Sequence, residues 1–255
     1  MRKQRKKTSI LYALLGLSIA LIVLSGGYLI FRHVILPVRQ ANDIQQLQGL
    51  FQPPSIPTAS LLSSAPQSSE NDANPLKEVQ QINPDICGWI RFDSLPIDYP
   101  IVKTTNNSFY LTHDYKKQTS PYGAIFMDFR CTVQSQNISL HGHHMNDGSM
   151  FASLVSLTDY PVYTQNKTFT VWEENQKTTW EIISIFRIQP DSDPFFYLQP
   201  DFQTEEEFLS FVEEVKRRSL FAIPASADAH DRLMTLSTCS YEKKGNRTVV
   251  VAKQV

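Results

Sequence analysis

Thr235-Leu236-Ser237-Thr238-Cys239-Ser240-Tyr241 is followed, after an interval of five residues, by Arg247-Thr248-Val249-Val250-Val251. Both segments are rich in β-branched residues, and the Gly245-Asn246 pair between them is typical of a turn, so the pattern predicts a β-hairpin. The hairpin brings Cys239 near Arg247, where a permanent cation could stabilise a thiolate or an oxyanion. A lone cysteine is also a common core residue. The hairpin by itself therefore leaves a structural and a catalytic role open.

A histidine-rich stretch lies about a hundred residues earlier, as the remote acid/base partner of a cysteine nucleophile often does. Its sequence is His141-Gly142-His143-His144-Met145-Asn146-Asp147-Gly148-Ser149-Met150-Phe151. We expect this stretch and the cysteine-bearing strand to meet in the fold.

Together the two stretches resemble the sortases, and class B sortases in particular. The resemblance is carried by Gly142-His143-His144-Met145-x-Asp147-Gly148-Ser149-Met150-Phe151, by Thr235-Leu236-Ser237-Thr238-Cys239 and by the downstream Arg247. Supporting segments are Asn83-Pro84-Asp85-Ile86-x-Gly88-Trp89-Ile90, Ile97-Asp98-Tyr99-Pro100-Ile101-Val102 and Gly123-Ala124-Ile125-Phe126-Met127-Asp128. The resemblance extends from about Pro75 to Val255. It implies a closed eight-stranded β-barrel with an N-terminal helix and a second helix inserted before the cysteine-bearing strand.

The N-terminal residues have the composition of a membrane anchor. Five Lys or Arg lie within residues 1–7, and residues 9–31 contain no charged residue. At about 1.5 Å per residue, a helix of that length crosses a hydrocarbon core of about 30 Å. The segment is longer than the apolar core of a signal peptide, so we expect a single uncleaved transmembrane helix over residues 9–31. The positive-inside rule places residues 1–8 in the cytoplasm and the rest outside the membrane.

Residues 32–74 are predicted to form a juxtamembrane stalk. Apolar residues at helical spacing predict a short helix in its first part, and these are Ile44, Leu47, Leu50 and Phe51. From Ser55 to Pro75 the chain has too few apolar residues to fold alone, which predicts a flexible spacer. Residues 75–255 then form one domain, large enough to bury a full core.

The 75–255 domain is predicted to be mostly β. Short segments divided by turn residues indicate strands at 87–92, 97–103, 124–128, 137–141, 168–173 and 179–189. Glu174-Asn175-Gln176-Lys177 is predicted to form the hairpin turn between the last two strands. A short helix is predicted over Leu76 to Ile82. A longer one is predicted from Thr204 to Arg218, since it opens with three glutamates and closes with three basic residues.

Cys239, His143 and Arg247 are the residue types that acyl transfer requires. A thiolate attacks a peptide carbonyl, an imidazolium protonates the leaving amine, and a guanidinium stabilises the developing oxyanion or holds the substrate backbone. An amine or water can then release the thioester, so these residues alone leave a transpeptidase and a thiol hydrolase or protease open. The resemblance implies a transpeptidase.

The resemblance assigns the acid/base role to His143. His144 would take that role only if the alignment slipped by one residue, and His141 lies where the family often has an aromatic residue. A His-x-His pair also occurs in zinc hydrolases, within a His-x-His-x-Asp-His pattern. Here Met145 and Asn146 stand in place of the Asp and the last His. No acidic cluster indicates calcium, so we predict neither a metal nor another cofactor.

Ser237 is predicted to border the substrate groove. It lies two residues before Cys239, and on a strand it shares the face of that residue. The resemblance further implies that four residues line the groove, namely Asn107, Leu111, Tyr197 and Leu198. The alternatives are an ordinary strand serine at Ser237 and core packing for the last two groove residues.

The function implied by the resemblance is that of a membrane-anchored cysteine transpeptidase of a Gram-positive cell surface. It would cleave a C-terminal sorting motif of the NPxT or LPxT kind after the Thr, through a thioester on Cys239. The expected partners are secreted surface proteins or pilins that carry the motif, and an amine of a peptidoglycan precursor or cross-bridge. A net charge of −1 gives no basis for a nucleic-acid partner.

Three further questions arise at this stage. A non-catalytic surface binding module would use Cys239 and His143 as packing residues. Pilin-polymerising class C sortases usually carry a second, C-terminal span, and the sequence to Val255 shows none, which favours class B. The chain has three cysteines, so at least one is unpaired, and a bridge between Cys87 and Cys131 is neither predicted nor excluded.

Overall fold

The computed structural model describes residues 2–51, 74–173, 176–189, 193, 196–239 and 246–255, with the backbone alone for 2–11, 13 and 239. The chain divides into two compact units, Met1–Leu47 and Gln48–Val255. The predicted spacer from Ser55 to Pro75 lies almost entirely outside the described residues. Residues 174–175 of one predicted turn and residues 242–245 of the other also lie outside them.

A long helix forms the N-terminal unit. It consists of α1 (Arg2–Ile30), a π-helical turn η1 (Phe31–Ile35) and α2 (Leu36–Leu50), which ends in the next unit. Over Leu14–Leu50 this helix is long and apolar enough to cross a membrane. The hydroxyls of Ser18 and Ser25 donate to backbone carbonyls of the preceding turn, at 2.9 and 3.0 Å. Both hydroxyls are therefore satisfied without water, as a lipid environment requires.

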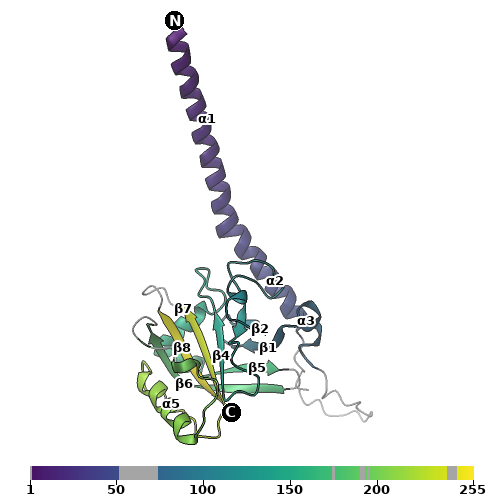
Figure 1. The fold of residues 1–255 in the computed structure, drawn as a ribbon, viewed down its shortest axis with the longest axis vertical. Helices are drawn as coiled ribbons and strands as arrows, with labels where there is room; N and C mark the ends of the chain where they lie inside the picture. The colour runs from purple at the N-terminus through teal and green to yellow at the C-terminus, as the bar shows by residue number, and fades with distance from the viewer. Residues whose placement is uncertain (1, 52–73, 174–175, 190–192, 194–195, 240–245) are drawn as a thin grey trace. The chain divides into compact units, whose positions relative to one another are not determined.

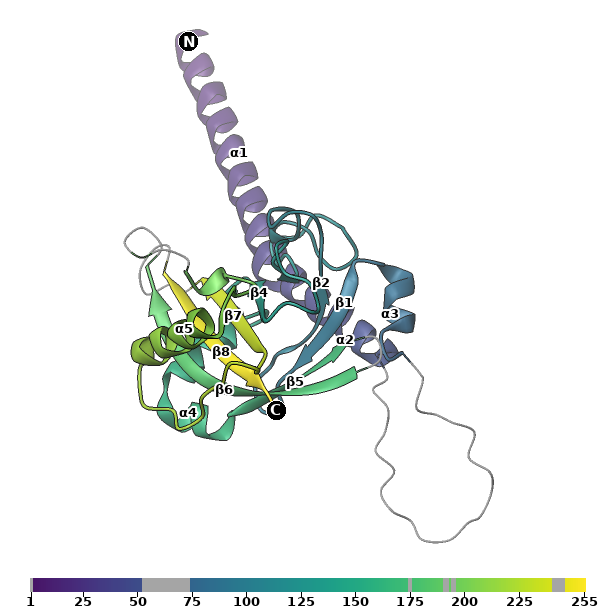
Figure 2. The same cartoon turned by 60° about the horizontal axis from the view of Figure 1, so that its bottom comes forward.

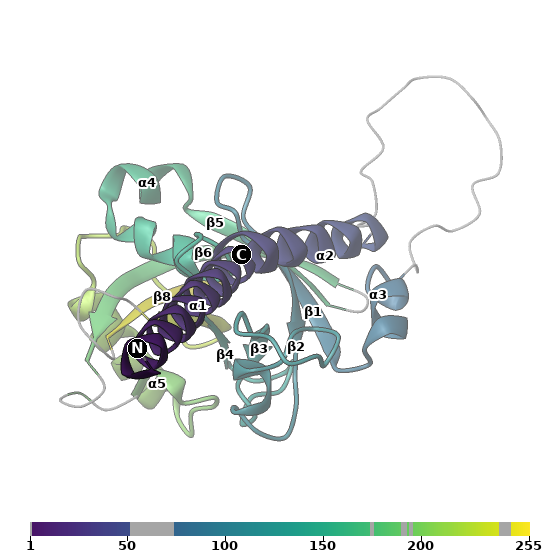
Figure 3. The same ribbon diagram turned by 90° about the horizontal axis from the view of Figure 1, so that it is seen from above.

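Eight strands of the second unit close into a β-barrel (Figure 1). They are β1 (Ile86–Arg91), β2 (Asp98–Val102), β3 (Ile125–Met127), β4 (Asn137–Gly142), β5 (Thr168–Glu173), β6 (Gln176–Ile188), β7 (Leu233–Cys239) and β8 (Arg247–Gln254). Their order around the barrel is β1-β2-β3-β4-β7-β8-β6-β5, and β5 pairs with β1 to close it. Figure 3 shows β1 to β4 following one another along one wall. The predicted closed eight-stranded barrel is confirmed.

The predicted strands are all present, with small differences at their ends. Gln176 and Lys177, which were predicted to lie in a turn, pair with Glu173 and Trp172 of β5 and belong to β6. Two strand pairs are parallel, β2 with β3 and β4 with β7, whereas the remaining pairs of the barrel are antiparallel.

Helix α5 (Glu205–Arg218) lies against the outside of the barrel, next to β6 and β8 (Figure 2). Its buried face consists of Phe208, Phe211, Val212 and Val215. The helix begins as predicted, since the Thr204 hydroxyl accepts from the Glu207 N–H at 3.2 Å. Because the helix covers the outer face of the sheet, β8 is buried on both faces. That burial explains the unbroken run of apolar residues Val249–Ala252 in the sequence.

Short helical segments occupy several connections. They are α3 (Lys77–Ile82), η3 (Phe109–Leu111), η4 (Ala152–Thr158), α4 (Tyr160–Gln165) and η5 (Phe196–Leu198). The first matches the helix predicted over Leu76 to Ile82. The other four were not predicted, because one or two turns are too few to produce a recognisable helical period.

Phe51 packs on the barrel although it precedes the predicted spacer. Its ring stacks on Trp89, with 4.3 Å between ring centres, and meets Trp172 edge-on at 5.4 Å. Only 3% of Phe51 is exposed. Nearby, the Gln48 side chain donates to the Asp98 backbone carbonyl at 2.9 Å. Gln48 and Phe51, which precede the spacer, are therefore part of the barrel unit.

Replacing Phe51 by Ala should cost about 3–5 kcal/mol of unfolding free energy, as for other fully buried aromatic rings. The neighbouring Leu50 is 39% exposed, so Leu50→Ala should cost less than about 1 kcal/mol. Guanidinium-induced unfolding of the full chain in detergent micelles measures both. Equal losses in the two variants would contradict the packing role of Phe51.

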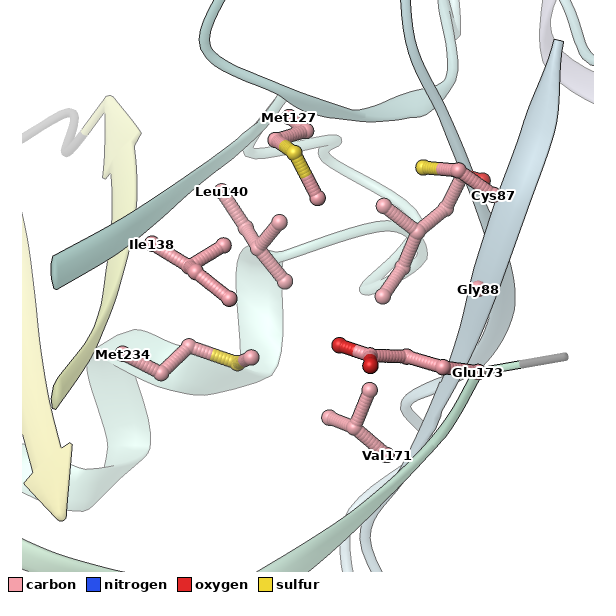
Figure 4. Close-up of a pocket in the computed structure, with 9 residues that line it drawn as sticks. Cys87, Gly88, Met127, Ile138, Leu140, Val171, Glu173 and Met234 are labelled. Carbon is pink, nitrogen blue, oxygen red and sulfur yellow. The ribbon is translucent and has the colours of Figure 1, made fainter. Parts of the chain in front are cut away.

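An acidic side chain points into the barrel interior. Glu173, the last residue of β5, borders a small cavity that is also lined by Cys87, Met127, Leu140, Val171 and Met234 (Figure 4). The cavity volume is about 10 Å³, close to the minimum that holds one water molecule. Burial raises the pKa of the Glu173 carboxyl, and the positive charge of Arg232 opposes that rise only in part. The ionised form of Glu173 is thus unfavourable in the folded state.

Glu173→Gln should stabilise the protein at neutral pH. A carboxyl with a raised pKa holds its proton more tightly in the folded than in the unfolded chain, so stability is greatest at low pH and falls as the pH rises through the folded-state pKa. The amide lacks this titration. Thermal unfolding between about pH 4 and pH 8 should show the wild-type Tm falling relative to that of the variant as the pH rises. Parallel profiles would contradict the assignment.

Candidate active site

Strand β7 pairs with β4 on one side and with β8 on the other, and these pairings concern all three predicted catalytic residues. In the parallel β4–β7 ladder, Gly142 pairs with Thr238, so the residues that follow, His143 and Cys239, continue from the ends of adjacent strands. In the antiparallel β7–β8 ladder, Cys239 pairs with Arg247. The backbone therefore brings His143, Cys239 and Arg247 to the neighbouring ends of three adjacent strands.

The His143 ring is held by a backbone carbonyl. Its Nε2 lies 2.7 Å from the carbonyl oxygen of Leu111. A carbonyl oxygen only accepts hydrogen bonds, so Nε2 carries a hydrogen in this contact. The ring nitrogen that remains for proton exchange is Nδ1.

Two glycines allow close packing around His143. A Cβ at Gly142 would lie 2.8 Å from the Phe151 ring. Gly123 has φ +59°, and a Cβ there would lie 2.4 Å from the Tyr110 carbonyl oxygen and 3.1 Å from the His143 ring. Real Cβ atoms essentially never lie within 3.0 Å of other atoms, and the 3.1 Å approach to the His143 ring is tighter than most real contacts. A larger residue at either position would therefore displace the surroundings of His143.

Hydrogen bonds close the loop that follows His143. The Phe151 N–H donates to the His143 carbonyl at 2.9 Å. Within the loop, the Asp147 carboxylate accepts from the Tyr122 hydroxyl at 2.7 Å and from the Ser149 hydroxyl at 2.6 Å. Partial burial opposes ionisation of Asp147, but these hydrogen bonds outweigh it and lower its pKa. The loop is thus tied to the chain segment that ends at Gly123.

The other two cysteines have the properties of structural residues. Both are free, so no bridge joins Cys87 to Cys131. Cys131 is fully buried, and its sulfur accepts from the Ser139 N–H at 3.4 Å. Burial raises the pKa of Cys87 to about 12 and also raises that of Cys131. Both thiols therefore stay protonated at neutral pH, and a protonated thiol is a poor nucleophile.

Three of the predicted substrate-binding residues are buried. Ser237 and Tyr197 are fully buried, and their hydroxyl oxygens lie 3.3 Å apart. Tyr197 and Leu198 belong to the apolar cluster between α5 and the barrel. Core packing is the alternative role that the sequence left for Tyr197 and Leu198. A role of these residues in substrate binding stays a prediction.

Asn107 and Leu111 lie in the connection between β2 and β3. Leu111 is 41% exposed, and its carbonyl is the group that holds His143. The Asn107 amide donates to the Asp128 carboxylate at 2.8 Å, and its carbonyl oxygen accepts from the Phe129 N–H at 2.9 Å. Both ends of the Asn107 side chain are therefore bonded within the protein. Contacts of Asn107 and Leu111 with substrate also stay predictions.

Sequence reasoning assigned no role to Asp128. Its carboxylate is fully buried and accepts from His141 Nε2 at 3.2 Å and from Arg130 Nε at 2.8 Å. His141 thus bonds to a carboxylate, and within the described part of the chain no cluster of His, Cys, Asp or Glu side chains is arranged to hold a metal ion. The one available signal was that Asp128 ends a segment that carries the family resemblance.

Comparison with known proteins agrees with this fold. The sortase domain model matches residues 90–255. Sortase B of Listeria monocytogenes is 34% identical over 184 residues, which cover 71% of this chain and 74% of that protein. The chain therefore belongs to the sortase family.

Solved structures agree on the subclass. The Staphylococcus aureus sortase B–substrate complex has a TM-score of 0.74 and 26% identity, with 87% of this chain and 98% of that one covered. Sortase B of Bacillus anthracis, in complex with the compound AAEK1, has a TM-score of 0.73 and 30% identity, with the same coverage. These relatives are sortase B proteins, which confirms the resemblance to class B, and sortases of this class are transpeptidases.

Gly123→Ala should be more harmful than Gly148→Ala. Both glycines have positive φ, +59° and +84°, so the backbone cost of Ala is about 1–2 kcal/mol at each position. Only at Gly123 does the new Cβ meet fixed atoms, since nothing lies within 4 Å at Gly148. Denaturant unfolding should show the larger loss for Gly123→Ala, and the ring NMR signals of His143 should shift only in that variant. Similar losses and unshifted signals would show that Gly123 is needed for its φ alone.

Proposed function

We propose that this protein is a membrane-anchored cysteine transpeptidase that joins exported proteins to an amine at a Gram-positive cell surface. The observation that carries the proposal is the strand register, in which Cys239 pairs with Arg247, and Thr238 pairs with Gly142, the residue before His143. The proposal also draws support from the similarity to a sortase B that was solved as a substrate complex.

The first half of the reaction forms a thioester. The Cys239 thiolate attacks the carbonyl carbon of the Thr in a sorting motif of the NPxT or LPxT kind, and the scissile bond is the peptide bond between this carbon and the next residue. Arg247 donates hydrogen bonds to the oxyanion of the tetrahedral intermediate. As the C–N bond breaks, His143 gives a proton to the leaving amine, and the acyl group stays on the sulfur.

The second half of the reaction transfers the acyl group to an amine. The acceptor is an amino group of a peptidoglycan precursor or cross-bridge, or a lysine of a pilin subunit. The amine attacks the thioester carbonyl and gives up a proton to His143. The C–S bond breaks, the Cys239 thiolate is restored, and a new amide bond joins the two partners. Water in place of the amine would make the same residues a thiol hydrolase.

The N-terminal helix supplies the membrane anchor in this proposal. The basic residues within 1–7 and the uncharged stretch over 9–31 favour an N-terminus in the cytoplasm and a catalytic unit outside the cell. The apolar side chains of α1 from Leu14 to Ile30 are mostly more than half exposed in the protein alone, as lipid-facing side chains are. Secreted proteins that carry a sorting motif would then reach the active site as they emerge from the membrane.

A ligation assay tests the proposed function. The full chain in detergent micelles is incubated with NPxT and LPxT peptides and with triglycine, and the products are identified by mass spectrometry. We expect a product cut after the Thr and joined to triglycine. Cys239→Ala should reduce the rate by about 10³-fold or more, because the nucleophile is lost. Arg247→Lys should reduce it by about 10²-fold, since Lys lacks the planar fork of donors.

Cys87→Ala is the matched control for the loss of a thiol. It should keep wild-type activity, because the Cys87 thiol is protonated and borders the small interior cavity. Cleaved peptide without ligated product would point to a thiol hydrolase. Failure of the wild type to cleave either peptide, or full activity of Cys239→Ala, would refute the proposed chemistry.

A further inference from the structure

The carboxylate of Asp128 is the common acceptor of several hydrogen bonds. Asp128 directly follows β3, and its side chain is 0% exposed. Its two oxygens accept from five groups, which are the Arg130 backbone N–H, Arg130 Nε, Arg130 Nη2, Asn107 Nδ2 and His141 Nε2. Burial alone would raise the pKa of this carboxyl. The donors outweigh that effect, so the pKa lies well below the usual range and the group stays ionised at neutral and mildly acidic pH.

One contact of this carboxylate is with β4, the strand that directly precedes His143. His141 Nε2 lies 3.2 Å from Asp128 Oδ2, and His141 lies on β4 two residues before His143. The Asp128 N–H also donates to the Ser139 carbonyl of the same strand at 2.9 Å. Asp128 therefore fixes the end of β4 from which His143 continues.

A second contact of the carboxylate is with the loop whose Leu111 carbonyl accepts from the His143 ring. Asn107 Nδ2 donates to Asp128 Oδ2 at 2.8 Å. Asn107 leads directly into η3 (Phe109–Leu111), whose last carbonyl accepts from His143 Nε2 at 2.7 Å. One carboxylate oxygen thus connects the two chain segments whose other ends meet at the imidazole.

We propose that Asp128 is a positioning residue, which sets the tautomer and the orientation of His143 by binding His141 on one side and Asn107 on the other. For catalysis this inference rests on the proposed function, because it assumes that His143 transfers the proton. The geometric reason is that misplacement of a catalytic group by about 1 Å can cost on the order of 10²-fold in rate. The Leu111–His143 contact is formed by two segments that are held together through Asp128.

A carboxylate is needed here, and an amide does not replace it. The groups that surround Asp128 are all donors, and an amide would turn an NH₂ group towards some of them. Asp128→Asn keeps the shape of the side chain while it breaks contacts on at least one oxygen. Arg130, with 42% of its side chain exposed, supplies the compensating positive charge from the surface side.

The test compares three variants of the full chain in detergent micelles. Asp128→Asn removes the carboxylate, and His141→Phe removes only the contact of that carboxylate with the His141 side chain on β4. Asp201→Asn is the matched control, because the Asp201 carboxylate accepts from the Gln136 N–H at 3.0 Å, next to the opposite end of β4. For each variant, ¹H–¹⁵N NMR of the histidine rings reports the tautomer of His143, and the ligation assay gives kcat and KM.

In the wild type and in Asp201→Asn, we expect a single His143 tautomer with the hydrogen on Nε2. In Asp128→Asn, we expect a mixture of tautomers and a fall in kcat of about tenfold or more, with a smaller change in KM. His141→Phe should show the same changes to a lesser degree. Asp128→Asn with a wild-type tautomer and a kcat within about twofold of Asp201→Asn would overturn the proposal.

The test remains decisive if a variant fails. Should Asp128→Asn not fold, His141→Phe decides, and a wild-type tautomer and kcat in that variant would overturn the proposal. The NMR comparison needs no substrate. If the wild type does not ligate peptides, the proposed function fails, while a His143 tautomer that depends on Asp128 still supports the positioning role.

Discussion

The parallel pairing of β4 with β7 is the constraint on which the active site depends. The two strands are far apart in the sequence, so no turn sets their register, and the long connection between them contributes β5, β6 and α5. The ladder runs without interruption from Asn137 with Leu233 to Gly142 with Thr238. A slip by one residue would turn every side chain of β7 to the opposite face. It would also separate the residues that follow, His143 and Cys239.

Burial on both faces holds the central strands in that register. Inside the barrel, β4 and β7 contribute Ile138, Leu140 and Met234 to the interior. Outside it, α5 covers β6 and β8 with a continuous apolar cluster. On the β1 and β5 side, where α5 does not reach, Phe51 covers Trp89 and Trp172. Any slip of a strand would expose apolar surface on one face or the other, and this makes the register costly to change.

Around His143 the polar groups are bonded before any substrate arrives. The ring has a carbonyl partner in Leu111, and the loop beyond it is closed by the Tyr122–Asp147 hydrogen bond. Groups that are already oriented need little reorganisation when charge develops in a transition state. The small side chain of glycine at 123 and 142 permits this packing, since a Cβ at either position would meet atoms at 2.8 Å or less.

The sequence by itself determined the elements whose signals are local. Turn residues and β-branched runs predicted the strands, the charged residues at its two ends predicted α5, and a long uncharged segment predicted the N-terminal helix. Tertiary structure alone decided that Phe51 belongs to the barrel unit, that Cys87 and Cys131 are unbridged thiols with raised pKa values, and that Asp128 joins His141 to Asn107. These features depend on contacts between residues that are distant in the sequence. A local sequence pattern reveals the periodicity and the ends of a helix or strand. The partner of a buried side chain is set only when the whole barrel closes.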